Sequence, residues 1–156
     1  MKITIALGTT SDESFFQQID AEHAQRIFQF LPREQRENLI EMQYLAKISA
    51  YKSQWPDATT YLVKSGRLGI GKIILSTYKS GMHIIDVVID EKYRNKGIGR
   101  QLLMLVEHRA LDIGCTKLTL SVATNNRAKT LYDHLGYKVT SQNETQIAMQ
   151  KQLMKG

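Results

Sequence analysis

A glycine-containing segment at residues 94–100 (RNKGIGR) joins the β-branched apolar run IIDVVID to the amphipathic stretch GRQLLMLVEHRAL. This pattern predicts a strand, a short loop and a helix. The first amide N–H groups of a helix lack intrahelical partners and lie at its positive end, so such a loop can bind phosphate oxygens. Glycines permit a ligand to approach closely, and Arg94, Lys96 and Arg100 add positive charge. The segment therefore predicts an anion-binding loop, with an ordinary Gly- and Lys-rich turn as the simpler alternative.

Two familiar phosphate-binding loops do not fit the segment. A P-loop has the pattern G-x-x-x-x-G-K-[ST], whereas Arg100 and Gln101 follow Gly99. A dinucleotide-binding loop has the pattern G-x-G-x-x-G, and Leu102 stands where the third glycine belongs. Both nucleotide-binding interpretations are therefore excluded.

A second motif follows at residues 125–137 (NNRAKTLYDHLGY). Residues 94–100 resemble the [RQ]-x-x-G-x-G/A loop of the GNAT superfamily of acetyl-CoA-dependent N-acetyltransferases. The second motif resembles that superfamily's signature N-x-x-A-x-x-L-Y-x-x-x-G-[FY], in the right order and separated by one helix and one strand. Together with their flanking strands the two signatures span residues 85–139, roughly a third of the chain.

Periodicity predicts about seven strands and about four helices in the order β-α-α-β-β-β-α-β-α-β-β. With the resemblance, the expected fold is α/β (α+β), with a GNAT-like mixed, mostly antiparallel central sheet. Strands are expected at residues 3–7, 60–64, 69–79, 82–89, 117–122, 137–141 and 146–153, and helices at residues 12–30, 33–54, 97–112 and 127–135. The resemblance further implies a sheet that splays at its middle to admit the pantetheine arm.

No Gly/Ser-rich or Pro-rich linker interrupts the pattern, so residues 1–156 are expected to form a single domain. By the resemblance it is an acetyl-CoA-binding N-acetyltransferase domain. The second helix is expected to carry a broad apolar face that includes Leu39, Ile40, Met42 and Leu45.

Composition narrows the location and the partners. The single cysteine, Cys115, excludes an intrachain disulfide and is expected to be buried, and no apolar run is long enough to span a membrane. A cytoplasmic protein is therefore expected. The net charge of +6 suits anionic partners, but the basic residues outside the loop are scattered, so no specific nucleic acid is expected.

The resemblance assigns roles on the cofactor side. It implies that the backbone of one strand binds pantetheine, that the loop amides bind the pyrophosphate, and that Arg94 holds the shape of the loop. Asn125 is either a cofactor contact or the cap of the following helix. The expected cofactor-binding residues are Val87, Val88, Ile89, Arg94, Asn95, Lys96, Gly97, Ile98, Gly99, Arg100, Asn125 and Tyr132.

The catalytic candidates are Tyr132, His83 and Asp86. By the resemblance, Tyr132 protonates the departing thiolate, and packing on its helix is the alternative. His83 is a candidate base or a surface histidine, and strand alternation puts Asp86 on the opposite face unless a bulge intervenes. The alternative glutamate position of the superfamily is occupied by Leu120, so that route is absent.

The resemblance implies transfer of an acetyl group from acetyl-CoA to an amine by direct attack in a ternary complex, with no metal. The alternative is a non-catalytic CoA-binding or regulatory module. The acceptor, a small molecule or a protein amine, stays open, as does a homodimer. The polar candidates for the acceptor site on the second helix are Glu37, Glu41, Gln43 and Tyr44.

Overall fold

The computed structural model describes residues 2–153, and the last three residues of the expected domain lie outside this range, as does Met1. The elements alternate in the order that periodicity predicts. They are β1 (Ile3–Leu7), α1 (Glu13–Ile27), α2 (Arg33–Gln54), β2 (Thr59–Ser65), β3 (Leu68–Tyr78), β4 (Gly81–Ile89), α3 (Ile98–Asp112), β5 (Lys117–Ala123), α4 (Ala128–His134), β6 (Lys138–Gln142) and β7 (Gln146–Gln152). Two 3₁₀ turns, η1 (Thr10–Asp12) and η2 (Glu91–Tyr93), precede α1 and follow β4.

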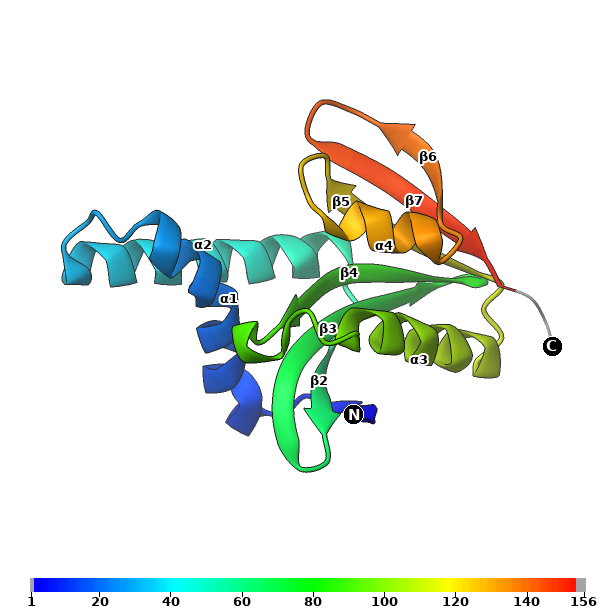
Figure 1. Cartoon of the computed structure of the whole chain (residues 1–156), viewed down its shortest axis with the longest axis horizontal. Coiled ribbons are helices and arrows are strands. Elements are labelled where there is room, and N and C mark those ends of the chain that lie inside the picture. The colour runs from blue at the N-terminus through cyan, green and yellow to red at the C-terminus, as the bar shows by residue number, and fades with distance from the viewer. Residues whose placement is uncertain (1, 154–156) are drawn as a thin grey trace.

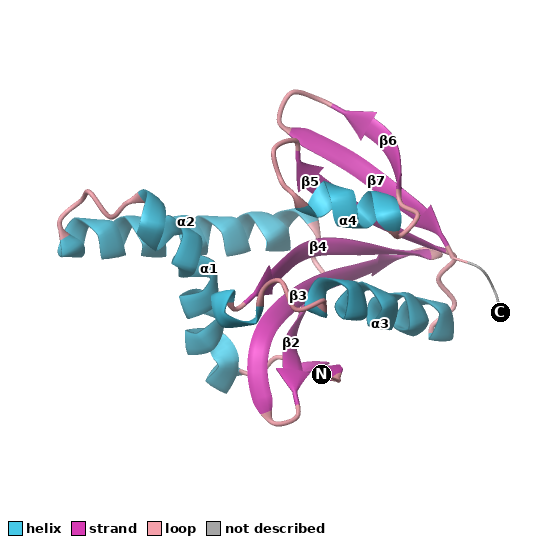
Figure 2. Cartoon of the chain, in the orientation of Figure 1, coloured by secondary structure: helices cyan, strands magenta, loops and turns pink. Residues whose placement is uncertain are grey.

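The strands form one seven-stranded sheet in the order β1-β2-β3-β4-β5-β7-β6 (Figure 2). Its neighbours pair antiparallel except at β4 and β5, which are parallel. The β4–β5 register ends at Ile84 opposite Leu120, although β4 continues to Ile89 and β5 to Ala123. The sheet therefore splays at its middle, as expected, and one edge of β4 is left without a partner strand beyond Ile84.

Helices cover the sheet around this split. The helix α3 contacts β1, β4 and β5 and lies across the near face of the sheet in Figure 1, whereas α1 contacts β3 and β4. Fully buried side chains on strands and α3, among them Val63, Ile70, Ile73 and Val106, form the core. Burial of apolar surface stabilises the folded state by about 25 cal/mol per Å². The buried side chains of α3 therefore hold this helix, with its N-terminus, in place beside the split in the sheet.

The apolar face expected on α2 is only partly buried. Ile40 is buried, but Met42 is 67% exposed and Leu45 is 55% exposed. The main contact of α2 is with α1, and the N-terminal part of α2 extends beyond the edge of the sheet (Figure 1). Phe30, which periodicity places on the first helix, follows the end of α1 and is 76% exposed. Among residues 2–153, no helix combines the length and the apolar character needed to cross a membrane.

Candidate active site

A cavity of about 1620 Å³ follows the split between β4 and β5. This volume exceeds the roughly 300–1,000 Å³ of an ordinary small-molecule site, so it can hold an extended ligand together with a second molecule. Its wall includes Asp20, His23 and Arg26 of α1, Lys47 of α2, residues 84–89 of β4, Arg94, Asn95 and residues 97–100 of the loop, residues 120–123 of β5, and Asn125 and Tyr132 near and on α4. The two signatures therefore meet at one cavity.

The loop presents a row of free backbone donors to this cavity. Asn95 has φ 61° and Gly97 has φ 76°, so the chain passes twice through the left-handed region before α3 begins. Such an angle is easy for glycine and uncommon for other residues, with asparagine among the more tolerant. Within the described residues, the amides of residues 95–100 donate no hydrogen bond to the protein. A β-carbon added at Gly97 would meet nothing within 4 Å, so the space beside this loop is open.

The strand β4 supplies the next part of the wall. Residues 87–89 pair with β3 on one side, with Val87 opposite Ile73 and Ile89 opposite Gly71. A β-carbon at Gly71 would lie 2.6 Å from the carbonyl oxygen of Val88, so glycine is needed for this close pairing. On the other side β5 has already diverged, and the backbone groups on this edge of β4 face the cavity.

All the predicted cofactor-binding residues except Lys96 line the cavity. The Lys96 ammonium instead lies 5.8 Å from the centre of the Tyr93 ring, a cation–π distance, and does not line the wall.

Asn125 lines the cavity, whereas the helix-capping contact belongs to its neighbour. The Asn126 side-chain oxygen accepts a hydrogen bond of 2.9 Å from the backbone amide of Ala128, the first residue of α4. The capping interpretation of Asn125 is therefore wrong. Its side chain makes no hydrogen bond within the part of the chain that the structure describes.

Tyr132 lies on α4 and lines the same cavity as Asp86. Burial raises the pKa of its phenol above the ordinary value of 10, and the negative charge of Asp86 adds to this effect. Its ring also packs against Tyr137 at 5.6 Å between centroids. Tyr132 therefore packs against Tyr137 and also lines the cavity, and its phenol keeps its proton in the neutral range.

A bulge changes the expected relation between His83 and Asp86. The β3–β4 register shifts so that Ile74 pairs with Asp86 and Leu75 with Ile84, which leaves Ile85 as the extra residue. A bulge reverses the alternation of side chains along a strand. Both side chains consequently face α2.

The two side chains have different surroundings on that face. The His83 ring stacks on Trp55 at 4.9 Å, and its Nδ1 lies 2.8 Å from the Thr119 hydroxyl. Burial lowers the pKa of His83 below its ordinary value of 6.5. His83 does not line the cavity, whereas Asp86 does.

The sequence did not predict a chain of ion pairs on the same side of the sheet. The Lys72 ammonium lies 2.7 Å from Asp20, Asp20 lies 2.9 Å from Lys47, and the Lys47 ammonium lies 3.0 Å from Asp86. Burial acts to lower the pKa of Lys47, but Asp86 and Asp20 outweigh it and raise the pKa above its ordinary value of 10.5. Lys47 therefore stays a cation beside Asp86 throughout the neutral range.

No local pattern in the sequence predicts this series of ion pairs. Its members come from α1, α2, β3 and β4, and each sits in a segment whose pattern is otherwise ordinary. By contrast, the acceptor candidates on α2 do not line the cavity. Glu37 pairs with Arg33 on the surface, and Tyr44 donates a hydrogen bond of 2.6 Å to Glu13.

Solved structures share this fold over nearly the whole chain. The PaiA N-acetyltransferase of Thermoplasma acidophilum, solved in complex with coenzyme A, superposes with a TM-score of 0.72 at 21% identity, over 97% of this chain and 99% of that one. The ribosomal-protein-S18-alanine N-acetyltransferase of Escherichia coli gives 0.70 at 20% identity, over 99% and 97%. At such identities the likeness shows the fold alone.

Two relatives match this chain over shorter segments of sequence. A thialysine N-epsilon-acetyltransferase of Bos taurus is 40% identical over 63 residues, which are 39% of this chain and 37% of the bovine protein. The uncharacterised N-acetyltransferase YycN of Bacillus subtilis is 37% identical over 71 residues, 45% of this chain and 42% of that protein. The chain thus matches less than half the length of these relatives.

The split sheet and the loop of free amides define a protein of the N-acetyltransferase fold class. A sequence model of the acetyltransferase (GNAT) family matches residues 21–137, which include both signatures and three quarters of the chain. The chain belongs to the GNAT family of acetyltransferases.

Proposed function

We propose that this chain is an acetyl-CoA-dependent N-acetyltransferase, formed by one domain, that transfers the acetyl group by direct attack of an amine in a ternary complex. The observation that carries the proposal is the row of free amides at residues 95–100, which opens into a cavity that continues through the split sheet. Family membership and the N-acetyltransferase names of the relatives support it.

The residues present fit coenzyme A. Consecutive amides at a helix N-terminus suit the pyrophosphate, and the unpaired edge of β4 at residues 87–89 suits the amide groups of pantetheine. Arg100 lines the same opening and adds positive charge, and the free side chain of Asn125 is a further polar contact. Acetyl-CoA, when bound, supplies the acetyl group as a thioester.

Asp86 is the proposed acceptor of the amine proton. A lysine-like amine of pKa about 10.4 needs near 4.6 kcal/mol to become neutral at pH 7, and an α-amino group needs about 1.4 kcal/mol. A carboxylate that lines the cavity, directly or through a water, lowers this cost. Lys47 fixes its orientation through the ion pair of 3.0 Å. His83 stays a candidate base, although its contacts with Trp55 and Thr119 favour a packing role.

Tyr132 is the proposed general acid. The N–C bond forms as the C–S bond breaks, and the phenol proton of Tyr132 passes to the departing sulfur. With ordinary pKa values of about 10 for a phenol and 8.5 for a thiol this transfer is uphill by roughly 2 kcal/mol. Burial raises the pKa of Tyr132, which makes the phenol a weaker acid, and desolvation of the departing thiolate raises the pKa of the thiol in the same way. The transfer becomes less uphill where the thiolate is desolvated more than the phenolate.

Direct transfer is proposed because the sole thiol is not available as a nucleophile. Cys115 is buried and does not line the cavity, and burial raises the pKa of its thiol. A route through an acetylated cysteine therefore has no support.

The acceptor is proposed only as an amine, in a small molecule or a protein. The relatives named above act on a thialysine ε-amine and on the alanine of a ribosomal protein, which are chemically different acceptors.

Binding and turnover can be tested separately. Coenzyme A at about 100 times its dissociation constant should stabilise the protein by about 2.7 kcal/mol, which is a rise of several degrees in Tm. Arg100→Glu should lose most of this shift with the same Tm in the absence of ligand. Unchanged melting of the wild type in saturating coenzyme A would exclude the proposal.

Turnover is measured as thiol release from acetyl-CoA with a panel of amines that includes lysine analogues, polyamines and peptides with free N-termini. Coenzyme A binding without thiol release from any of these would favour the non-catalytic module instead.

A further inference from the structure

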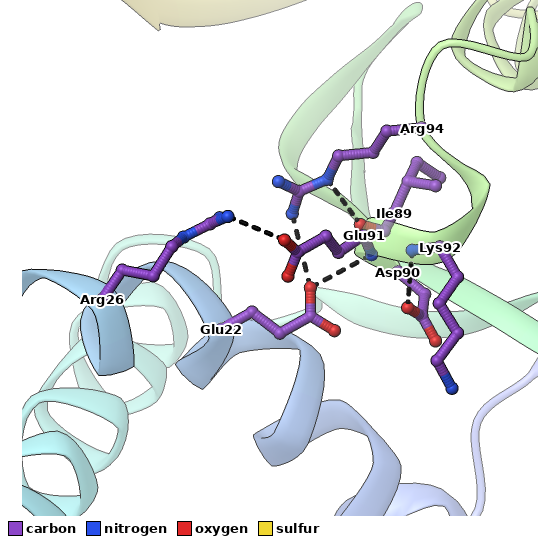
Figure 3. Close-up of polar contacts among 7 residues, drawn as sticks. All are labelled: Glu22, Arg26, Ile89, Asp90, Glu91, Lys92 and Arg94. Atoms are coloured by element: carbon purple, nitrogen blue, oxygen red, sulfur yellow. Dashed lines mark hydrogen bonds and ion pairs between the residues drawn. The ribbon is translucent and has the colours of Figure 1, made fainter. Parts of the chain in front are cut away.

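A cluster of charged side chains joins α1 to the segment that enters the phosphate loop (Figure 3). The Glu22 carboxylate of α1 accepts a hydrogen bond of 3.0 Å from the backbone amide of Glu91. The same Oε2 atom lies 3.8 Å from a terminal nitrogen of Arg94, and the Arg94 Nε donates a hydrogen bond of 3.0 Å to the carbonyl of Ile89. Arg94 therefore connects the end of the segment 90–94 back to Ile89, the last residue of β4.

A second contact strengthens the same junction. Arg26, one turn further along α1, donates a hydrogen bond of 2.7 Å to the side chain of Glu91. The turn itself is closed by the buried Asp90, whose carboxylate accepts a bond of 3.1 Å from the Lys92 amide. The backbone path between β4 and the free amides is thus held by α1 on one side and by its own turn on the other (Figure 3).

The position of Glu22 excludes a direct role in binding the anion. A carboxylate repels phosphate, and the Glu22 side chain is only 16% exposed, with its charge directed at Arg94 and the Glu91 amide. A backbone hydrogen bond to a charged acceptor is worth more than one to a neutral acceptor. The cluster therefore acts on the geometry of the loop.

The helix that carries Glu22 also forms part of the cavity wall. Asp20 and His23 of α1 line the cavity, and Asp20 connects through Lys47 to Asp86. One helix thus contacts both the segment before the phosphate loop and the ion-pair chain on the proposed acceptor side.

We propose that Glu22 is a positioning residue. Through Arg94 and the Glu91 amide it holds the backbone of the loop at residues 95–100 in the conformation that binds phosphate, and it couples this loop to α1. Binding at the loop then restricts α1, and with it the wall that carries Asp20. This inference rests on the proposed function, because it requires that coenzyme A binds at residues 94–100.

Hydrogen–deuterium exchange with coenzyme A alone tests the coupling without an acceptor. In the wild type, coenzyme A should slow exchange both at residues 94–103 and along α1. In Glu22→Ala, affinity for coenzyme A should fall about 10-fold, and at saturation protection should reach residues 94–103 but not α1. Glu22→Gln keeps an oxygen acceptor for the Glu91 amide, so it should recover part of the affinity and of the α1 protection.

The matched control is Glu37→Ala, which removes a glutamate from an exposed ion pair with Arg33 on α2. It should retain wild-type affinity, wild-type protection of α1 and the wild-type Tm, because an exposed i,i+4 pair contributes little to stability. Equal affinity and equal α1 protection in Glu22→Ala and the wild type would overturn the inference. Protection of the loop without α1 in the wild type would overturn it as well and leave the proposed function intact. No protection at residues 94–103 would refute both.

Discussion

Two tyrosines in ring contact allow a matched test of proton donation at the residue scale. Tyr132 lines the cavity, whereas Tyr137, 5.6 Å away between ring centroids, is buried and does not. Tyr132→Phe should lower kcat by about 100-fold or more, because general acid catalysis contributes that much, and leave the Kd for coenzyme A within about twofold. Tyr137→Phe, which deletes a hydroxyl without a partner among the described residues, should leave kcat unchanged. Equal rates for the wild type and Tyr132→Phe would assign Tyr132 to packing.

The same argument predicts how the rate depends on pH. The pKa of Tyr132 is raised above 10, so the phenol keeps its proton through the neutral range. Loss of the proton from Tyr132 cannot limit the rate below pH 10, and a falling rate between about pH 8 and 10 would have to come from another group.

His83 makes a different prediction, on stability. Burial lowers its pKa below 6.5 in the folded protein, so the unfolded chain binds the proton more tightly. The free energy of unfolding should therefore fall as the pH drops below about 6.5, and the imidazole's contribution should be fully present above it. Urea unfolding at about pH 8 and about pH 5 should show a larger loss of stability for the wild type than for His83→Gln. Identical losses would mean that His83 titrates as a solvated histidine.

At the scale of elements, the part of the cavity wall that carries the two signatures could be predicted from the sequence because its residues are consecutive. The loop before α3 and the turn before α4 each lie within a few positions, so their resemblance to the two signatures was enough to identify them. Even there, the side chain of Asn126 rather than that of Asn125 bonds the first amide of α4, since neighbouring asparagines have equal propensity for such a bond and only the local geometry selects one.

The other side of the cavity is assembled by packing, and no local pattern encodes it. The bulge at Ile85 turns Asp86 toward α2, and an insertion of one residue leaves no mark in a run of β-branched residues. Lys72 is almost fully buried in β3, where an apolar residue is usual, and its ion pair with Asp20 of α1 makes this burial tolerable. The helix α2 shows the converse, since the apolar side chains of Met42 and Leu45 are exposed.

At the scale of the whole molecule, the net charge of +6 raises the question of what attracts an anionic ligand. Overall charge and a local cluster make different predictions, because surface charges are screened beyond about 10 Å at 0.1 M salt. Arg94, Arg100 and Arg127 line the cavity, whereas Arg33 begins α2 and is 83% exposed on the part that extends from the sheet (Figure 1).

Arg100→Gln and Arg33→Gln each lower the net charge by one unit, so they separate the two causes. For the wild type the association rate of coenzyme A should fall about 10-fold between about 0.01 M and 0.5 M salt, in the range of electrostatic steering. Arg100→Gln should reduce the rate at low salt and flatten this dependence, while Arg33→Gln should behave as the wild type. Stopped-flow measurement of the association rate for the three proteins distinguishes the two causes. Equal effects of the two substitutions would assign the attraction to the overall charge, and the basic cluster at the cavity would then have no special part in it.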